Sequence, residues 1–210
     1  MLKNIYLVSL LLFLSITINA QKKLNNSDAQ KIREQIIKKS TSTNTIASDF
    51  VQFKHLSFLD KDIESSGKLF FKEPNLIKWQ YEIPFKYSVV FKNDKLFIND
   101  DGTKSDIDLS SNKAFKSLNS LIVKSVKGDM FDEEKFDVTY FKDKRDNYLI
   151  TFTSKEASLK SFIGKFELIF HKNNLDVLQI KMIESSEDYT KIVFKNQKNN
   201  EAISDSVFNN

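Results

Sequence analysis

The stretch that decides the fold runs from Gly67 to Pro84 and reads GKLFFKEPNLIKWQYEIP. It contains both prolines and the only tryptophan of the chain, Trp79. From position 77 onward apolar and polar residues alternate, so that Ile77, Trp79, Tyr81 and Ile83 share one face, which is typical of a half-buried β-strand. Proline cannot donate a hydrogen bond to a strand ladder, so the two prolines bracket the strand. A large aromatic and aliphatic face is therefore directed inward.

The N-terminus has the pattern of an export signal. Lys3 supplies a positive charge, Ile5–Ile16 is an apolar run, and Ala20 offers a small residue at a cleavage point. The run is shorter than the roughly 20 apolar residues that span a bilayer. We therefore expect residues 1–20 to be a cleaved signal peptide, with a signal anchor as the alternative, and residues 21–210 to form a single domain.

Composition limits the classes of function. The chain has no cysteine, so packing alone must hold this exported protein together, and thiol nucleophiles and cysteine metal sites are excluded. The formal net charge is +4 with both signs interspersed, which does not indicate a nucleic-acid surface. Phe-Lys dipeptides recur, but neighbouring side chains of a strand point to opposite faces, so phenylalanine faces inward and lysine outward. The 19 phenylalanines require a large core or an apolar cavity.

Helical periodicity appears twice and strand patterns fill most of the rest. Residues 28–40 form an amphipathic helix behind a capping box at Ser27 and Gln30, and residues 111–127 form a second one that ends at Gly128. The expected strands cover residues 46–58, 62–71, 77–83, 87–92, 95–99, 107–109, 136–141, 148–153, 164–170, 175–183 and 189–195. Short turns between successive strands predict an antiparallel meander.

These elements predict a mainly β fold with some α. An antiparallel sheet of about 10–11 strands curves into an open, incomplete β-barrel, and a lid of amphipathic helices closes it. The pattern alone leaves two interiors open: an ordinary core filled by its own side chains, or a cavity.

Catalytic groups are not gathered by the sequence. His55 lies in a strand and His171 in a turn, and the nearest paired carboxylates, Glu133-Glu134 and Asp106/Asp108, lie in charged, turn-like segments. We expect no catalytic residue, no metal site and no cofactor, and hence no enzyme. An exported hydrolase that uses Glu133 or His55 on a glycan or ester is kept as an alternative.

The central stretch resembles the signature of the LolA family of periplasmic lipoprotein carriers. The pattern is Gly-x-Leu-x-Phe-x-x-Pro-Asn-Leu-x-x-Trp, followed by Pro84. Further similarities cover most of the chain: Phe50-x-Gln52, Leu96-Phe97-Ile98, Phe170 with Leu175 and Ile180, Thr190-x-Ile192-x-Phe194, and Asn200, Ile203 and Phe208 in the tail. The chain departs from the family at Glu73, where many members carry a basic residue, and its second helix lacks the usual proline.

The resemblance implies a helix-lidded open barrel whose apolar cavity takes the acyl chains of lipoproteins. The lipid-binding residues it implies are Leu69, Phe71, Ile77, Trp79, Tyr81, Val89 and Phe91 from the sheet, and Phe115, Leu118, Leu121 and Ile122 from the lid. It also implies a monomer in the periplasm of a Gram-negative bacterium. Its partners would be acylated lipoproteins, an ATP-driven release complex of the inner membrane and an outer-membrane acceptor, with no nucleic acid.

Three other functions remain open from the sequence. The first is an envelope sensor or regulator of lipid or lipoprotein that uses the same fold. The second is the exported hydrolase named above, and the third is a structural or adhesion domain with a filled core. The apolar, Phe-rich face suits a smooth cavity that holds acyl chains.

Overall fold

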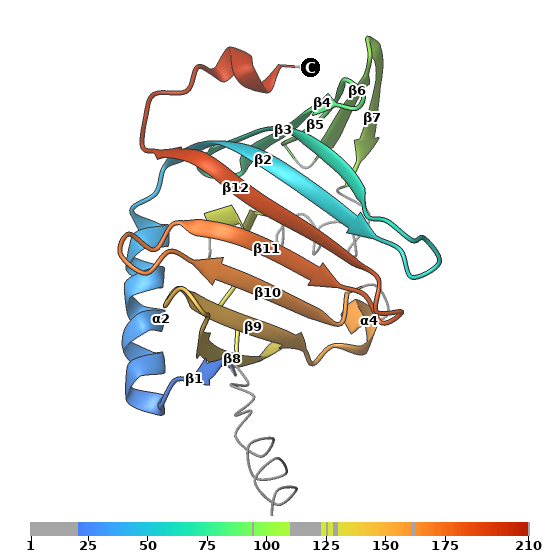
Figure 1. The fold of residues 1–210 in the computed structure, drawn as a ribbon. Coiled ribbons are helices and arrows are strands. Elements are labelled where there is room, and N and C mark those ends of the chain that lie inside the picture. Colours follow the sequence, from blue (N-terminus) through green and yellow to red (C-terminus); the bar gives the residue numbers. More distant parts are fainter. Residues whose placement is uncertain are drawn as a thin grey trace, which may run out of the picture.

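Twelve antiparallel strands form one curved sheet in the computed structural model, which describes residues 21–93, 95–109, 123–124, 126–127, 130–160 and 163–209 (Figure 1). In the first half of the chain they are β1 (Lys22–Lys23), β2 (Thr45–His55), β3 (Ile63–Lys72), β4 (Leu76–Ile83), β5 (Tyr87–Lys92), β6 (Lys95–Asp100) and β7 (Thr103–Asp108). In the second half they are β8 (Phe136–Lys142), β9 (Tyr148–Ser154), β10 (Lys165–Phe170), β11 (Val177–Ile183) and β12 (Tyr189–Asn199).

The strand order is β1-β8-β9-β10-β11-β12-β2-β3-β4-β5-β6-β7. The first and last strands of the chain thus pair beside each other in the centre, through β12 and β2, and the meander runs outward on both sides. Within the described residues β1 and β7 form the two edges and do not pair, so the sheet is open. The antiparallel, open, mainly β fold expected from the sequence is confirmed.

Several strand expectations were wrong in detail. The described part of the chain forms twelve strands instead of about 10–11, β2 ends at His55 instead of position 58, and β7 covers Thr103–Asp108 instead of 107–109. The strand β1 was missed because two consecutive lysines carry no alternating pattern, although Lys22 and Lys23 pair with Lys142 and Phe141 of β8. β12 runs to Asn199 instead of ending at position 195, because a register shift between Lys195 and Lys198 lets the strand continue along β2.

Helix α2 (Asn26–Thr41) buries Ile32 and Ile36 in the apolar core, as its periodicity predicts. Its N-cap was predicted wrongly. Asn25 caps the helix by accepting a hydrogen bond of 2.8 Å from the backbone N–H of Asp28, whereas Ser27 already lies inside the helix. Asparagine and serine cap equally well, so the pattern does not choose between them.

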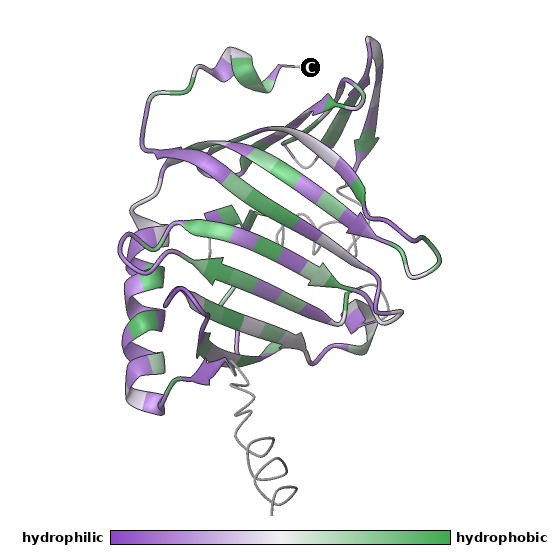
Figure 2. Cartoon of the chain, viewed as in Figure 1, coloured by the Kyte–Doolittle hydropathy of each residue, from purple (hydrophilic) through white to green (hydrophobic). Residues whose placement is uncertain are grey.

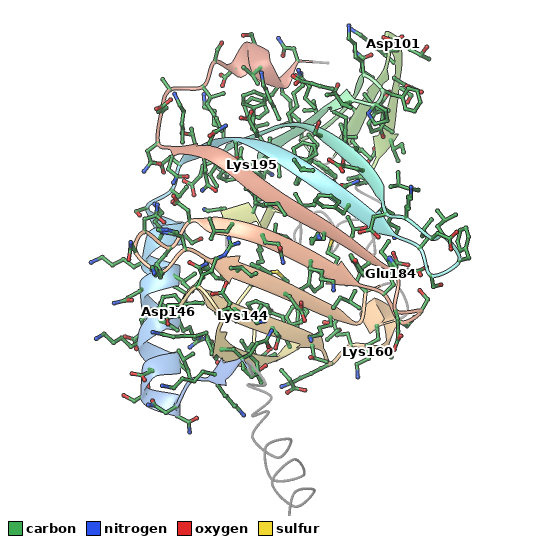
Figure 3. All side chains as sticks on the ribbon, viewed as in Figure 1. Asp101, Lys144, Asp146, Lys160, Glu184 and Lys195 are labelled. Carbon is green, nitrogen blue, oxygen red and sulfur yellow. The ribbon has the colours of Figure 1, made fainter. Side chains whose placement is uncertain are left out.

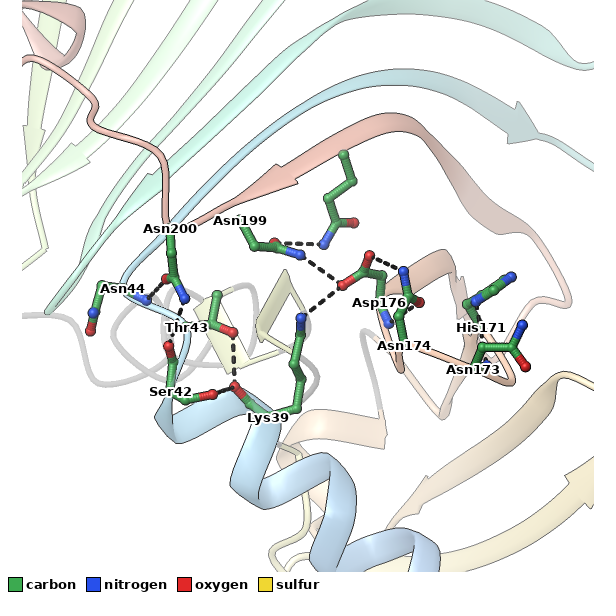
Figure 4. Close-up of polar contacts among 11 residues, drawn as sticks. Lys39, Ser42, Thr43, Asn44, His171, Asn173, Asn174, Asp176, Asn199 and Asn200 are labelled. Carbon is green, nitrogen blue, oxygen red and sulfur yellow. Dashed lines mark hydrogen bonds and ion pairs between the residues drawn. The ribbon is translucent and has the colours of Figure 1, made fainter.

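Polar contacts tie the C-terminal end of α2 to the sheet (Figure 4). The ammonium of Lys39 lies 3.2 Å from a carboxylate oxygen of Asp176, which also accepts a hydrogen bond of 2.7 Å from Asn199. The side chain of Asn200 accepts from the amide of Asn44 and donates to the carbonyl of Ser42. The helix is therefore fixed to the start of β11 and to the end of β12.

The core lies on the inner face of the curved sheet. Along the strands, hydrophobic residues alternate with hydrophilic ones, as the colours of Figure 2 show. The inner face and α2 share one cluster of buried residues, which includes Phe50, Leu69, Trp79 and Phe152. Lysines such as Lys72 and Lys78 lie on the outer face, because they are out of phase with that set.

The tail forms a layer on this outer face, which its polar sequence did not predict. After β12 the chain folds back to the short 3-10 helix η2 (Asp205–Phe208), which contacts β4 and buries Phe208. Lys72 donates to the carbonyl of Ile203 and Lys78 to that of Val207, both at 3.1 Å. Burial lowers the pKa of Lys78 below its ordinary value.

The second predicted helix, residues 111–127, is described only at its end. Residues 110–122, 125 and 128 lie outside the described residues, and Gly128, the expected cap, is among them. Val123, Lys124, Val126 and Lys127 have helical conformation, and Val123 and Val126 pack into the core. The short α4 (Ala157–Lys160) follows β9. None of the helices that the structure describes is long and apolar enough to span a membrane.

Candidate functional site

The candidate site is the inner face of strands β3, β4 and β5. Antiparallel pairing places Leu69 opposite Trp79 and Phe71 opposite Ile77 across β3 and β4. Across β4 and β5, Ile77 pairs with Phe91 and Trp79 with Val89. With Tyr81, these are the seven sheet residues expected from the sequence. The structure brings all seven together on one face, in a continuous apolar wall, and Trp79 at its centre is 8% exposed.

Two aromatic residues that sequence reasoning did not assign to the site complete the wall. Phe50 of β2 meets the ring of Trp79 edge-on at a centroid distance of 5.1 Å and the ring of Tyr81 at the same distance. Phe194 of β12 lies 6.2 Å from Trp79. The two ring pairs of Phe50 are edge-to-face, and such pairs contribute about 0.5–1.5 kcal/mol each beyond their buried area. Both residues belong to family motifs quoted above, and that signal pointed to them.

The structure gives Gln52 of the Phe50-x-Gln52 motif a role beside the wall. Residues two apart in a strand share a face, so Gln52 also lies on the inner side. Its side-chain oxygen accepts a hydrogen bond of 3.0 Å from the hydroxyl of Tyr81. Burial, followed by the nearby Tyr87 phenol, raises the pKa of Tyr81 to about 12, while the bond to Gln52 opposes this rise. The tyrosine is therefore neutral, and its one polar atom inside the wall is satisfied.

Gly67 opens the motif because the backbone of β4 passes very close to it. A Cβ atom at Gly67 would lie 1.9 Å from the backbone oxygen of Gln80 and 2.8 Å from the Cα of Tyr81. The β3–β4 register shifts at the step from Ser66 to Gly67, as in a β-bulge. Only glycine allows this approach without moving backbone, and the bulge sets which residues of β4 face inward.

Glu73, where the chain departs from the family pattern, has a basic partner from elsewhere. Its carboxylate lies 2.6 Å from the ammonium of Lys127, at the end of the segment predicted as the second helix. The ammonium also lies 5.5 Å from the centre of the Phe71 ring, within the range of a cation–π contact. This contact joins the second helical segment to the β3–β4 turn at one end of the wall.

The four predicted residues of the lid, Phe115, Leu118, Leu121 and Ile122, lie outside the described residues. Of the segment that contains them, the structure describes the helical end, with Val126 and Lys127.

Among the described residues, the histidines and carboxylates named as catalytic candidates lie in separate parts of the fold and contact other groups. His55 ends β2 and lies 2.9 Å from Asp62 with its ring stacked on Tyr189, while His171 follows β10 at the opposite end of the sheet. Glu133 pairs with Arg33 at 3.6 Å and Asp106 with Lys95 at 3.2 Å. In the part of the chain that the structure describes, no three histidines or carboxylates are grouped to hold a metal ion.

A pocket of about 460 Å³ lies on the outer face, beside the tail. It is lined by Lys92, Asn93, Phe97, Lys104, Ser105, Asp106, Phe208 and Asn209. None of the residues expected to bind lipid lines it. Phe97 pairs with Val90, which is out of phase with Val89 and Phe91, so the sheet separates this pocket from the inner wall. The pocket and the inner wall are therefore separate features.

An open antiparallel sheet with an apolar inner face defines the class of open-barrel proteins. The chain belongs to the LolA family, because residues 41–210 match the family model described as outer membrane lipoprotein carrier protein LolA. The family resemblance of the sequence is thereby confirmed. No curated protein sequence matches the chain.

Solved structures share the fold at low sequence identity. The MucA/MucB complex of Pseudomonas aeruginosa matches at 12% identity with a TM-score of 0.51, over 87% of this chain and 61% of that chain. The lipoprotein LppX of Mycobacterium tuberculosis matches at 8% identity with a TM-score of 0.50, over 86% and 99%. A LolA superfamily protein of Nitrosomonas europaea matches at 11% identity with a TM-score of 0.45, over 87% and 97%. At these identities the likeness concerns the fold alone.

Proposed function

We propose that this protein is a non-enzymatic periplasmic carrier of lipoproteins that holds their acyl chains against the inner wall of the sheet. The observation that supports this most directly is the wall itself, in which Phe50, Trp79 and Phe194 meet on the concave side of an open sheet. The Tyr81 hydroxyl donates to the side-chain oxygen of Gln52, whose amide nitrogen donates to Ser65, so an acyl chain meets no unpaired polar group there.

The physical chemistry of the cargo explains why a carrier is needed. Burying a methylene is worth about 0.8 kcal/mol, so an acyl chain of roughly 15 methylenes gains about 12 kcal/mol on leaving water. Several chains together would exceed the practical ceiling of noncovalent affinity, near 18–21 kcal/mol. Cargo therefore passes from one apolar site to the next, and the direction depends on small differences in affinity between donor, carrier and acceptor.

The proposed binding residues are the seven of the sheet, with Phe50 and Phe194 added, and the four of the lid. In this proposal Phe115, Leu118, Leu121 and Ile122 cover the wall and move aside when cargo enters. Support comes from Val126 and Lys127 at the end of the same segment, since Val126 is buried in the core and Lys127 pairs with Glu73. The packed rings around Trp79 are the resting arrangement that an acyl chain would displace.

The partners follow from the role. The protein would take acylated lipoproteins from an ATP-driven complex of the inner membrane, cross the periplasm as a monomer after loss of residues 1–20, and deliver to an outer-membrane acceptor. The description of the family as outer membrane lipoprotein carriers supports this assignment.

The single tryptophan gives a direct test of acyl-chain binding. Trp79 lies in the wall, so titration with a diacylated lipopeptide should shift and saturate its fluorescence. A fluorescent fatty acid serves as a second reporter, and Trp79→Glu should abolish its binding while circular dichroism stays that of the folded protein. If the native protein neither changes its emission nor binds the fatty acid, the wall is a filled core and the carrier proposal fails.

A second assay separates the carrier from a sensor with the same fold. A carrier should release lipoprotein from inner-membrane vesicles only in the presence of ATP. A sensor should bind the lipopeptide and release nothing.

A further inference from the structure

Large apolar side chains gather at one end of the sheet. In the part of the chain that the structure describes, six large apolar side chains are exposed, and one of them is Ile107 of β7. The other five lie where β2 turns into β3 and where β4 turns into β5: Phe58 at 78%, Leu59 at 39%, Ile63 at 51%, Ile83 at 63% and Phe85 at 78%. We name these five residues the apolar rim. Figure 1 shows the β2–β3 turn projecting beyond its neighbours.

The apolar rim borders one end of the inner wall. Along β4 the inward-facing Ile77 and Trp79 are 0% and 8% exposed, whereas Ile83, which is 63% exposed, pairs with Ser66 beyond the bulge. Ile83 therefore lies on the opposite face from Trp79, contrary to the simple alternation of the sequence. On β3, Ile63 is in phase with Leu69 and Phe71 of the wall. Exposed apolar patches on soluble proteins usually mark places where something binds. The apolar rim therefore lies at the margin of the wall and has the exposed apolar character of a binding surface.

Acidic side chains surround the apolar rim. Antiparallel order places the turns β2–β3, β4–β5, β6–β7 and β11–β12 at the same end of the sheet. Residues 54–64, 82–86, 100–104 and 184–188 carry nine carboxylates and four lysines, although the whole chain has a net charge of +4. Figure 3 marks two of these carboxylates, Asp101 and Glu184. Hydrogen bonds join the turns, because the amide of Asp101 donates to the carbonyl of Lys86 and the amide of Ser57 donates to the side-chain carboxylate of Asp188.

The charge of this end selects the kind of partner. An anionic bilayer surface attracts basic patches and would repel this acidic one. A protein surface that presents apolar side chains flanked by lysine or arginine complements both the apolar residues and the carboxylates. We propose that the apolar rim docks a protein partner of this kind. This rests on the proposed function in one respect, since a partner seated here lies at the margin along which acyl chains would enter or leave the wall.

The test uses a defined probe and variants that keep the fold. The probe is a labelled amphipathic peptide of leucine and lysine, followed by fluorescence anisotropy, and its control has glutamate in place of lysine. The variant Phe58→Ser/Phe85→Ser changes two side chains that are each 78% exposed, so folding should be unaffected. Ile107→Ser is the matched control, because it removes an exposed isoleucine away from these turns.

The expected result is saturable binding of the lysine peptide, weakened at least about tenfold in Phe58→Ser/Phe85→Ser and unchanged in Ile107→Ser. Asp60→Asn/Asp101→Asn should weaken it too and reduce its salt dependence. The proposal is overturned if the glutamate peptide binds equally well or if Phe58→Ser/Phe85→Ser leaves peptide binding intact. It is also overturned if phosphatidylglycerol vesicles bind the protein through Phe58 and Phe85 while the peptide does not.

Acyl-chain binding is measured in the same proteins and keeps the two proposals apart. If Phe58→Ser/Phe85→Ser loses the peptide and keeps the fatty acid, docking and acyl binding are separate properties, as proposed. If the protein binds the peptide but never binds the fatty acid, the carrier proposal fails and the docking proposal stands. If the protein binds the fatty acid but never binds the peptide, the docking proposal fails and the carrier proposal stands.

Discussion

The ammonium of Lys127 lies 2.6 Å from the carboxylate of Glu73 and sits over the ring of Phe71. Their positions in the chain are far apart, and the contact fixes the end of the second helical segment to the turn that follows β3. The Lys127 side chain is 15% exposed and that of Glu73 39%. A pair so placed is screened less by water than one on the open surface.

Removing this pair should loosen the helical segment. Glu73→Gln, Lys127→Met and the double variant form a cycle, for which we expect a coupling energy of about 0.5–3 kcal/mol in urea unfolding. If the segment is part of the lid, the single variants should also release the fatty acid faster. Strictly additive effects on the free energy of unfolding would show that the pair contributes nothing.

Gly67→Ala should destabilise the protein, because its Cβ would meet backbone atoms of β4 that cannot turn aside. Overpacking of this kind costs about 1–3 kcal/mol, and we expect the upper part of that range. Gly164→Ala is the matched control, since its nearest neighbour would be 3.9 Å away, an ordinary contact. Equal urea midpoints for the two variants would contradict the close approach at Gly67.

Tyr81 should make stability fall at high pH. Its pKa is about 12 in the folded protein, against an ordinary value of 10.0. The unfolded chain therefore loses this proton first, so the contribution is fully present below pH 10 and disappears as the pH rises from 10 through 12. Two pKa units correspond to about 2–3 kcal/mol.

The measurement for Tyr81 is the free energy of unfolding between pH 9 and pH 12 in the native protein and in Tyr81→Phe. Tyr140, whose pKa burial also raises to about 12, is present in both proteins, so the difference isolates Tyr81. Parallel pH curves for the two proteins would refute the assignment.

Phe208→Ala should detach the tail while the sheet stays folded. Phe208 is buried on the outer face, where Lys72 and Lys78 hold the neighbouring backbone. Truncating a buried phenylalanine to alanine costs about 3–5 kcal/mol of stability. The few hydrogen bonds that would still hold this short segment contribute less than that. Hydrogen exchange should then rise in residues 201–209 and stay unchanged in β2 and β12. Ser206→Ala, at an exposed position of the same segment, is the control.

Local pattern was enough for much of the sheet. The alternation through Ile77, Trp79 and Tyr81 sets which side chains share a face, and that periodicity belongs to any strand. The full set of seven sheet residues came from the resemblance to the LolA family, and the structure pairs them across β3, β4 and β5. The sequence did not assign Phe50 or Phe194 to the wall, because their neighbours come from strands distant in the chain.

Features that depend on contacts between distant segments could not be predicted from the sequence. The tail is polar apart from Ile203 and Phe208, so local pattern did not predict its layer. Phe208 is nevertheless buried, because η2 packs on β4, where Lys78 donates to the carbonyl of Val207. The apolar rim was missed for a related reason. A phenylalanine in a turn has no pattern of its own, and only the shared end of four hairpins gathers Phe58 and Phe85 with so many carboxylates.

By itself, the sequence determined the family, the antiparallel strands and the inward direction of Trp79, since these depend on residues a few positions apart and on backbone geometry common to all strands. Only the tertiary structure decided which strands meet at the centre, that Glu73 pairs with Lys127, and that apolar and acidic turns form one margin. Contacts between distant segments depend on how the sheet curves and closes its turns together, and no local pattern encodes that curvature.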